Sequence, residues 1–161
     1  MHQSSLDRMS EFVADYLDPM SSLKILDAGS YNVNGSYKSL FKNWQYSGLD
    51  VEPGPNVDIV VNGYDWGINE EYDVVISGQA LEHVEDMSKF MKAIYLAVKP
   101  GGLVCIIAPG VNKRGKTFKR HRYPIDCWRI LPDGMKFLLD DFDIIKIWRR
   151  DMDCIGIAKK P

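Results

Sequence analysis

The residues best placed to do chemistry lie in one stretch near the start of the chain, Leu23-Lys24-Ile25-Leu26-Asp27-Ala28-Gly29-Ser30-Tyr31-Asn32-Val33-Asn34-Gly35. An apolar run ends in the carboxylate of Asp27, and a turn rich in Gly and Asn follows. Gly29 lets a ligand approach the main chain, and Gly35 tolerates the positive φ angles that such a turn requires. A buried strand leading through such a turn into a short helix is typical of the ligand-binding corner of an open α/β sheet. An ordinary turn without a ligand is the alternative.

The same turn argues against a dinucleotide. A pyrophosphate needs the pattern Gly-x-Gly-x-x-Gly at a helix N-terminus. Tyr31 and Asn34 stand where the second and third glycines would be. A nucleoside without phosphates needs less clearance, so it fits this turn better.

A second acid follows at a spacing with a mechanical meaning. Residues 45–50 read as a strand that ends in Asp50, 21 residues after Gly29. The end of a neighbouring strand lies beside the ligand corner, where a carboxylate can accept both hydroxyls of a ribose. The alternative is a solvent-facing Asp before the turn at residues 52–55.

A polar and aromatic group follows the next expected strand, residues 57–61. An amide or carboxylate here could bind an adenine edge, with Tyr64 or Trp66 against the ring. A polar turn with a buried aromatic side chain fits the pattern equally well. The group comprises Asn62, Gly63, Tyr64, Asp65 and Trp66.

Two histidines could accept a proton from a hydroxyl acceptor. His83 lies in the turn after the expected strand 72–77, where a structural role at a helix N-terminus is the alternative. His121 lies in a long stretch, residues 110–124, that holds six Lys or Arg and no acid. Because a long loop after a strand end is usually functional, we expect residues 111–125 to form a mobile lid over an anionic acceptor. A solvated basic loop is the alternative.

The surrounding pattern supplies the elements that would position these groups. Apolar residues at helical spacing predict a helix over residues 5–17, and Asp86 begins a second helix with Met87, Phe90, Met91, Ile94 and Val98 on its apolar face. Residues 100–102 end that helix and lead into a fifth strand. Alternation of strands and helices indicates a parallel sheet covered on both faces. A loop at about 110–131, a helix to about 139 and a closing antiparallel pair complete a single domain over residues 1–161.

Composition sets the broad class. The chain is 45% hydrophobic and 26% charged with a net charge of −2, as in a globular protein, and no apolar run approaches a membrane span. No basic stretch followed by an apolar one begins the chain, so we expect no signal peptide. Cys105, Cys127 and Cys154 are odd in number and widely spaced, which favours a reducing, cytoplasmic location over a disulfide framework or a zinc site.

Five short motifs in register resemble the class I (Rossmann-like) S-adenosylmethionine-dependent methyltransferases. They are Ile25-Leu26-Asp27-Ala28-Gly29, Gly48-Leu49-Asp50, Tyr72-Asp73-Val74-Val75-Ile76-Ser77, Leu81-Glu82-His83-Val84 and Lys99-Pro100-Gly101-Gly102-Leu103. Residues 121–124 and 126–129 further resemble a small bacterial subgroup that acts on sugars or other metabolites. The resemblance implies an α/β fold with a seven-stranded sheet, six strands parallel and the last one antiparallel, with helices on both faces.

The resemblance also implies a site. The cofactor S-adenosylmethionine, which leaves as S-adenosylhomocysteine, would lie across the carboxyl ends of the strands. Its expected contacts are Asp27, Gly29, Ser30, Tyr31, Gly35, Asp50, Val51, Asn62, Gly63, Tyr64, Ser77, Gly78 and Gln79. The expected substrate contacts are Arg120, His121, Arg122, Tyr123 and Trp128, with His83 and His121 as candidate bases and no metal.

The favoured function is methylation of an oxygen atom of a small, anionic acceptor. We expect the enzyme to use no metal and to have no membrane partner. Methylation of RNA, with the basic loop on the phosphates, is less favoured because the chain has no overall positive charge. A binding module that kept the nucleoside pocket without turnover is the third hypothesis. The identity of the acceptor and the oligomeric state stay open.

Overall fold

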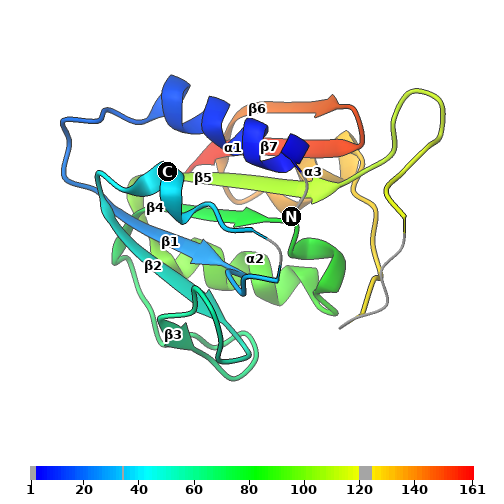
Figure 1. Ribbon diagram of the computed structural model, residues 1–161. Helices are drawn as coiled ribbons and strands as arrows, with labels where there is room; N and C mark the ends of the chain where they lie inside the picture. The colour runs from blue at the N-terminus through cyan, green and yellow to red at the C-terminus, as the bar shows by residue number, and fades with distance from the viewer. Residues whose placement is uncertain (1–2, 34, 120–124) are drawn as a thin grey trace.

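The computed structural model describes residues 3–33, 35–119 and 125–161, and in it seven strands form one sheet in the order β3-β2-β1-β4-β5-β7-β6 (Figure 1). The strands are β1 (Lys24–Ala28), β2 (Gln45–Asp50), β3 (Ile59–Val60), β4 (Tyr72–Gly78), β5 (Val98–Pro109), β6 (Asp143–Arg150) and β7 (Asp153–Lys159). Strand β7 runs antiparallel to both of its neighbours, and the other strands share one direction. The predicted mostly parallel sheet with an antiparallel last strand is confirmed.

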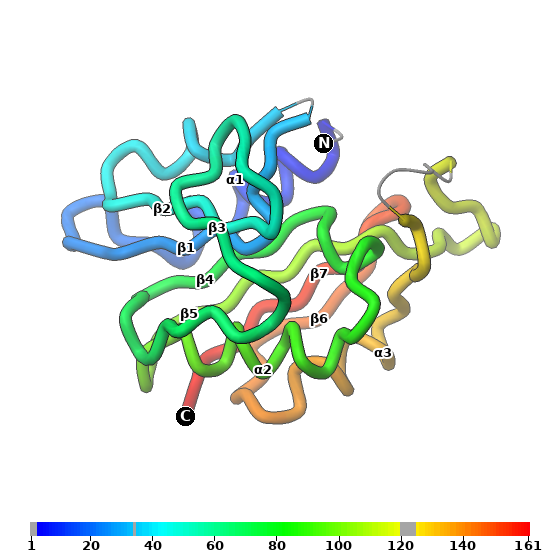
Figure 2. The backbone as a smooth tube through the Cα atoms, turned by 90° about the horizontal axis from the view of Figure 1, so that it is seen from below, coloured from blue at the N-terminus to red at the C-terminus, as the bar shows by residue number. Residues whose placement is uncertain are grey.

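Helices cover both faces of this sheet (Figures 1 and 2). Helix α1 (Gln3–Tyr16) packs on one face, and α2 (Met87–Ala97) and α3 (Pro132–Leu138) pack on the other. Successive strand residues point to opposite faces, so Val74 and Ile76 of β4 pack with α1 whereas Val75 packs with α2. No described helix has the length and apolar character needed to cross a bilayer.

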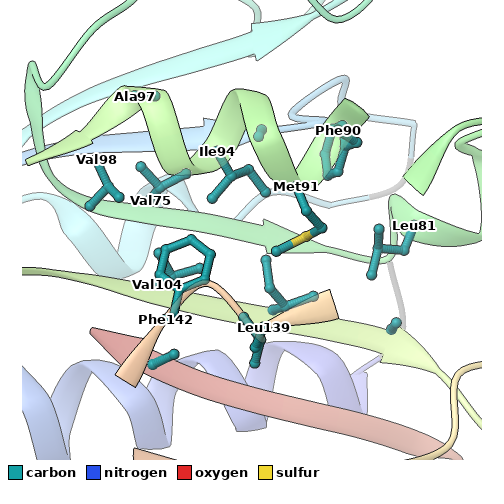
Figure 3. Close-up of a cluster of buried hydrophobic side chains, with 14 of the residues drawn as sticks. Val75, Leu81, Phe90, Met91, Ile94, Ala97, Val98, Val104, Leu139 and Phe142 are labelled. Atoms are coloured by element: carbon teal, nitrogen blue, oxygen red, sulfur yellow. The ribbon is translucent and has the colours of Figure 1, made fainter. Parts of the chain in front are cut away.

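The core beneath α2 follows from the spacing of its apolar residues (Figure 3). Phe90, Met91 and Ile94 lie on one face of the helix and are buried against the sheet. The helix begins at Asp86, whose carboxylate accepts a hydrogen bond of 3.1 Å from the main-chain N–H of Lys89, as predicted for an N-cap.

Two expected elements are shorter than predicted. The residues after the first turn form only η1 (Lys38–Phe41), one turn of 3-10 helix, and the third strand contracts to two residues. No helix connects β3 to β4 in the described residues 61–71, where Gly63 and Gly67 adopt φ angles of +75° and +64° that do not continue a helix. The alternation of strand and helix therefore holds only from β4 onward.

The end of α2 also differs from the prediction. Val98, expected on the apolar face of the helix, is extended and begins β5, and its N–H donates to the carbonyl of Ile94 to close the helix. Residues 100–102 lie inside β5, at a register shift against β4 rather than between a helix and a strand. The Pro-Gly-Gly sequence therefore marks a bulge, where Gly101 takes a φ of +76°.

Candidate functional site

The predicted ligand corner forms where β1 passes into its turn. Gly29 has a φ of +84°, and a Cβ there would lie 2.5 Å from the Cβ of Ala80, so only Gly lets this turn contact the turn after β4. The main-chain N–H groups of Gly29 and Ser30 both donate to the carbonyl of Leu49, at 2.8 and 3.1 Å. The Ser30 hydroxyl is buried and donates to the carbonyl of Asn56. The carboxyl ends of β1, β2 and β4 are thereby held together.

Asp50 lies at this corner as predicted. One carboxylate oxygen accepts the N–H of Tyr31 at 3.0 Å, and the other accepts the N–H of Val51 at 2.8 Å. The Tyr31 ring covers Gly54, because a Cβ at Gly54 would lie 2.2 Å from that ring. The turn after β1 is therefore packed on the turn after β2. The Asp50 carboxylate is fixed in orientation, and its remaining lone pairs can accept hydroxyl groups.

Asp27 is the buried acid of the corner, with 2% of its surface exposed. The Tyr46 hydroxyl donates to Oδ2 at 2.5 Å, whereas Oδ1 has no hydrogen-bond partner among the described residues. Burial raises the pKa of Asp27 to about 7, although the hydrogen bond from Tyr46 opposes the rise. A buried oxygen without a donor is costly, and a cationic or N–H group of a ligand would relieve that cost.

The residues at the end of β4 take different positions. Ser77 is buried and its hydroxyl donates to the carbonyl of Ala28 at 2.8 Å. Gly78 lies against the ring of Tyr37, and Gln79 has a φ of +57° and donates from its side chain to Asp153 of β7 at 3.0 Å. Ser77 and Gln79 thus support the site through protein contacts, and the Gly78 main chain adjoins the buried phenol.

The predicted adenine side is divided. Val51, Asn62 and Gly63 are exposed beyond the ends of β2 and β3. The Tyr64 hydroxyl accepts the N–H of Asp86 at 3.0 Å, and Trp66 packs its edge on Phe90, with ring centroids 5.7 Å apart. Trp66 is therefore a partly buried aromatic side chain packed against the core, which is closer to the alternative than to a ring free to stack on adenine.

His83 lies in η2 (Leu81–His83), directly after the turn that meets Gly29. Its Nδ1 donates to the carbonyl of Ile125. Because a carbonyl only accepts, Nδ1 carries the proton and Nε2 is the basic nitrogen of the neutral ring. The His83 side chain is 22% exposed, so it lies at the boundary between the protein interior and the surface.

The segment 125–129 lies across η2. The N–H of Cys127 donates to the carbonyl of Glu82 at 2.8 Å, and the Trp128 indole N–H donates to the carbonyl of Val84 at 2.7 Å. Trp128, predicted to bind substrate, is thus anchored at its nitrogen while part of its ring stays exposed. Together with Thr117 and Phe118, residues 125–129 line a hollow of about 1040 Å³.

Sequence reasoning missed an ion pair in this segment. Both nitrogens at the end of the Arg129 side chain donate to the carboxylate of Asp126, the Nη2–Oδ2 distance being 2.8 Å, and Nε donates to Thr117. An acid and an Arg three residues apart were the available signal. Asp126 holds the pKa of Arg129 above its ordinary value. The guanidinium is therefore already paired within the protein.

The described part of the basic loop contains several internal hydrogen bonds. The N–H of Asn112 donates to the carbonyl of Lys116, and the Asn112 side chain accepts the N–H groups of Arg114 and Lys116. The Thr117 hydroxyl donates to the carbonyl of Gly110. Residues 112–116 thus form a hydrogen-bonded turn beyond the end of β5 (Figure 1). The predictions for Arg120, His121, Arg122 and Tyr123 fall outside the described residues.

Gly35 lies in the described chain with a φ of +137°, and its N–H donates to the side chain of Asn32. It therefore shapes the turn as expected. Among the described residues, no group of three His, Cys, Asp or Glu side chains could hold a metal ion.

Residues 3–144 match the family described as "Methyltransferase domain". The chain therefore belongs to this methyltransferase family, as its motifs predicted. A curated relative, the ubiquinone biosynthesis O-methyltransferase of Methylobacterium sp. (strain 4-46), is 31% identical over 70 residues, which are 44% of this chain and 25% of that protein. The matched part thus spans a quarter of the length of this relative.

Solved structures share the fold at low identity. A SAM-dependent methyltransferase of Methanosarcina mazei is 16% identical, with a TM-score of 0.69, over 92% of this chain and 96% of that one. The 1,6-didemethyltoxoflavin-N1-methyltransferase of Burkholderia thailandensis, solved with 1,6-didemethyltoxoflavin and S-adenosylhomocysteine, is 13% identical, with a TM-score of 0.71, over 98% of this chain and 79% of that one. The [4+2]-cyclase SpnF is 15% identical, with a TM-score of 0.74, over 99% and 82%. At these identities the likeness establishes the fold and leaves the reaction to be argued from the site.

Proposed function

We propose that this domain transfers a methyl group from S-adenosylmethionine to the hydroxyl of a small acceptor, with His83 accepting the proton. The observation that carries the proposal is the meeting of Asp27, the Gly29 turn, Asp50 and His83 at one edge of the sheet. Membership of the methyltransferase family gives the reaction class.

The corner fits the cofactor chemically. The unpartnered Oδ1 of Asp27 suits the ammonium of the methionine moiety, because a buried carboxylate gains most from a charged donor. Asp50 suits the ribose hydroxyls. Gly29 leaves the main chain bare between them. Bound S-adenosylmethionine supplies a methyl group that is already activated by its sulfonium.

The protein's remaining task is to place the acceptor and take its proton. The hollow between residues 117–118 and 125–129 adjoins His83 through Ile125, whose carbonyl fixes the imidazole. The proposal requires the hydroxyl of an acceptor bound here to reach Nε2, which also lies 3.8 Å from Oε1 of Glu82. Orientation and exclusion of water then supply most of the rate acceleration.

An anionic acceptor is favoured by the exposed Lys113, Arg114 and Lys116 on the turn beyond β5. Arg129 is held by Asp126, whereas Lys113, Arg114, Lys116 and the neighbouring Lys119 are exposed and could meet such a ligand. The same turn supports RNA methylation as a second candidate, since phosphates would meet the same cations.

The first experiment measures binding by calorimetry for S-adenosylmethionine, S-adenosylhomocysteine and NAD. We expect both sulfur compounds to bind and NAD to fail. Transfer of labelled methyl is then screened over sugars, phenols, carboxylates, phosphorylated metabolites and RNA. Labelling of RNA alone would replace the small-acceptor proposal, and cofactor binding without transfer to any acceptor would favour a binding module.

Cofactor binding should also depend on pH. Because the pKa of Asp27 is about 7, the acid must lose its proton to bind an ammonium group. We expect the cofactor Kd to be roughly five- to tenfold weaker at pH 6 than at pH 7.5. The Asp27→Asn variant should bind more weakly at both values and lose this dependence.

A further inference from the structure

Glu82 is a buried acid that the site described so far does not use. Its side chain is 1% exposed, and neither carboxylate oxygen has a hydrogen-bond partner in the described part of the chain. Its own main-chain carbonyl accepts the N–H of Cys127, which fixes the backbone. Burial of a carboxyl group that receives no side-chain donor removes its hydration without replacing it, which destabilises the folded state.

Among residues 3–33, 35–119 and 125–161, four charged or titratable groups lie near Glu82. Arg129 and Asp126 come from the segment 125–129, Asp153 comes from β7, and His83 is its neighbour in η2. Arg129 is nearby but donates to Asp126, Thr117 and the carbonyl of Trp128. Burial raises the pKa of Glu82 to about 7, whereas its own main-chain N–H and, to a lesser extent, the positive charge of Arg129 oppose the rise.

His83 is a neighbour of this acid that could share a proton with it. Its Nε2 is 3.8 Å from Oε1 of Glu82, while Nδ1 is occupied by the carbonyl of Ile125. The nitrogen that is basic in the neutral ring is therefore the one that faces the buried carboxyl group. A negative charge at this distance in a poorly hydrated site favours the protonated imidazole.

From this juxtaposition we infer that Glu82 is a positioning residue that raises the proton affinity of His83 Nε2 during methyl transfer. The inference rests on the proposed role of His83. The acceptor O–H bond breaks as its proton passes to Nε2, and the oxygen electron pair forms the new bond to the methyl carbon. The bond between the methyl carbon and sulfur breaks at the same time, and its electron pair remains on the sulfur. The imidazolium that results faces the Glu82 carboxylate, and later releases its proton to water.

The test follows the titration of His83 by NMR in the full chain without cofactor, so it does not depend on a known acceptor. The sequence holds only His2, His83 and His121, and the signal missing from His83→Gln assigns the residue. We expect Glu82→Gln to lower the pKa of His83 by about one pH unit or more. Glu85→Gln, an exposed neighbour, is the matched control and should leave it unchanged. An unchanged His83 titration in Glu82→Gln would overturn the inference.

The wild-type titration covers the case in which Glu82→Gln does not fold. A coupled pair should titrate in two steps, so the His83 signal should show a second inflection caused by the titration of Glu82. A single step at the ordinary histidine value would also overturn the inference.

Turnover separates this inference from the proposed function. Once an acceptor is known, Glu82→Gln should lower kcat about tenfold or more and should leave the cofactor Kd unchanged. The acidic limb of its pH–rate profile should move to lower pH, because the pKa of His83 falls. If His83→Gln retains full turnover, the proton-accepting role of His83 fails. If His83→Gln is inactive but Glu82→Gln keeps the wild-type pH profile, only the role of Glu82 fails.

Discussion

The hydroxyl of Tyr46 donates a 2.5 Å hydrogen bond to Asp27, which places a phenol from β2 on a buried acid of β1. Asn56 completes the group by donating to the same hydroxyl at 2.9 Å. Burial raises the pKa of Tyr46 well above its ordinary range, so the phenol stays a donor. Of these two groups, Asp27 rather than Tyr46 therefore carries the negative charge that a ligand would meet.

The raised pKa of Asp27 has a consequence for stability without ligand. Its value moves from 3.8 to about 7, so between these values the unfolded chain is ionised while the folded one keeps its proton. Ionisation thus favours unfolding as pH rises through this window. The free energy of unfolding of Asp27→Asn, measured with urea and compared with that of the wild type, should rise by about 1–3 kcal/mol as the pH increases from 4 to 8. Asp58→Asn is the control, because its carboxylate accepts the N–H of Gly48 and the pKa rise of Asp27 does not involve it. A constant difference between Asp27→Asn and wild type across this range would contradict the assignment.

Loss of the carboxylate of Asp50 should weaken cofactor binding. Asp50→Ala removes the proposed ribose contacts and the hydrogen bond from the main-chain N–H of Tyr31. The free energy of cofactor binding, measured by calorimetry, should become about 1–3 kcal/mol less favourable. Glu52→Ala, at an exposed position of the same turn, provides the comparison. Equal affinities for the wild type and Asp50→Ala would remove the ribose assignment.

Gly78 should tolerate no side chain. A Cβ there would lie 2.2 Å from the Tyr37 hydroxyl and 2.5 Å from its ring, and that phenol is bonded to Ser5 of α1 at 2.5 Å. Gly78→Ala should lower the free energy of unfolding by about 1–3 kcal/mol. Gly134→Ala, in α3 with no atom nearer than 3.9 Å, should be neutral or stabilising. Tyr37→Ala removes the ring that a side chain at residue 78 would meet. The double variant Gly78→Ala/Tyr37→Ala should therefore lose less free energy of unfolding than the sum of the two single variants, and additive losses would argue against this clash.

Lys160 should be a structural lysine. It is 5% exposed, and its ammonium donates to the carbonyls of Tyr95 and Val98 at 2.9 Å each and to Glu70 at 3.1 Å. The charge therefore lies at the carboxyl end of α2, where it is favourable. Lys160→Met should lower the free energy of unfolding by about 2–4 kcal/mol in urea unfolding, because buried carbonyls lose their donor. Lys159→Met, at an exposed position, should change it little.

The basic turn should act on the acceptor alone. Replacing Lys113, Arg114 and Lys116 together with Gln should raise the KM for an anionic acceptor several-fold, with the cofactor Kd unchanged. The wild-type KM should rise with salt, because exposed charges are screened over about 8–10 Å at ordinary ionic strength. If the best acceptor is neutral, and if its KM changes neither with salt nor in the triple Gln variant, this role is excluded.

Local pattern was sufficient to predict the corner and most strands. Gly29 and Asp50 lie where an apolar run meets a turn, and the parallel sheet brings such ends together. The length of the helix after β1 could not be predicted from sequence. Residues 36–41 form only one turn of 3-10 helix, and this turn is sufficient to bury Phe41 in the core.

The acid next to His83 could not be recognised from sequence. Glu82 is buried by the segment 125–129 and by β7, which lie far along the chain. Nothing local distinguishes it from an exposed Glu at the start of a helix. Its environment depends on tertiary packing, which short patterns do not report.

Main-chain atoms carry much of the contact between η2 and the segment 125–129. The carbonyls of Glu82 and Val84 accept donors from that segment, and the carbonyl of Ile125 receives His83 in return. Side chains between Thr117 and Ile125 take no part in these three bonds. These three anchors hold the two ends of the proposed acceptor site through atoms that do not depend on the side chains of residues 118–119. If the proposed roles hold, sequence changes at these two positions would alter acceptor preference and leave the proposed cofactor corner unchanged.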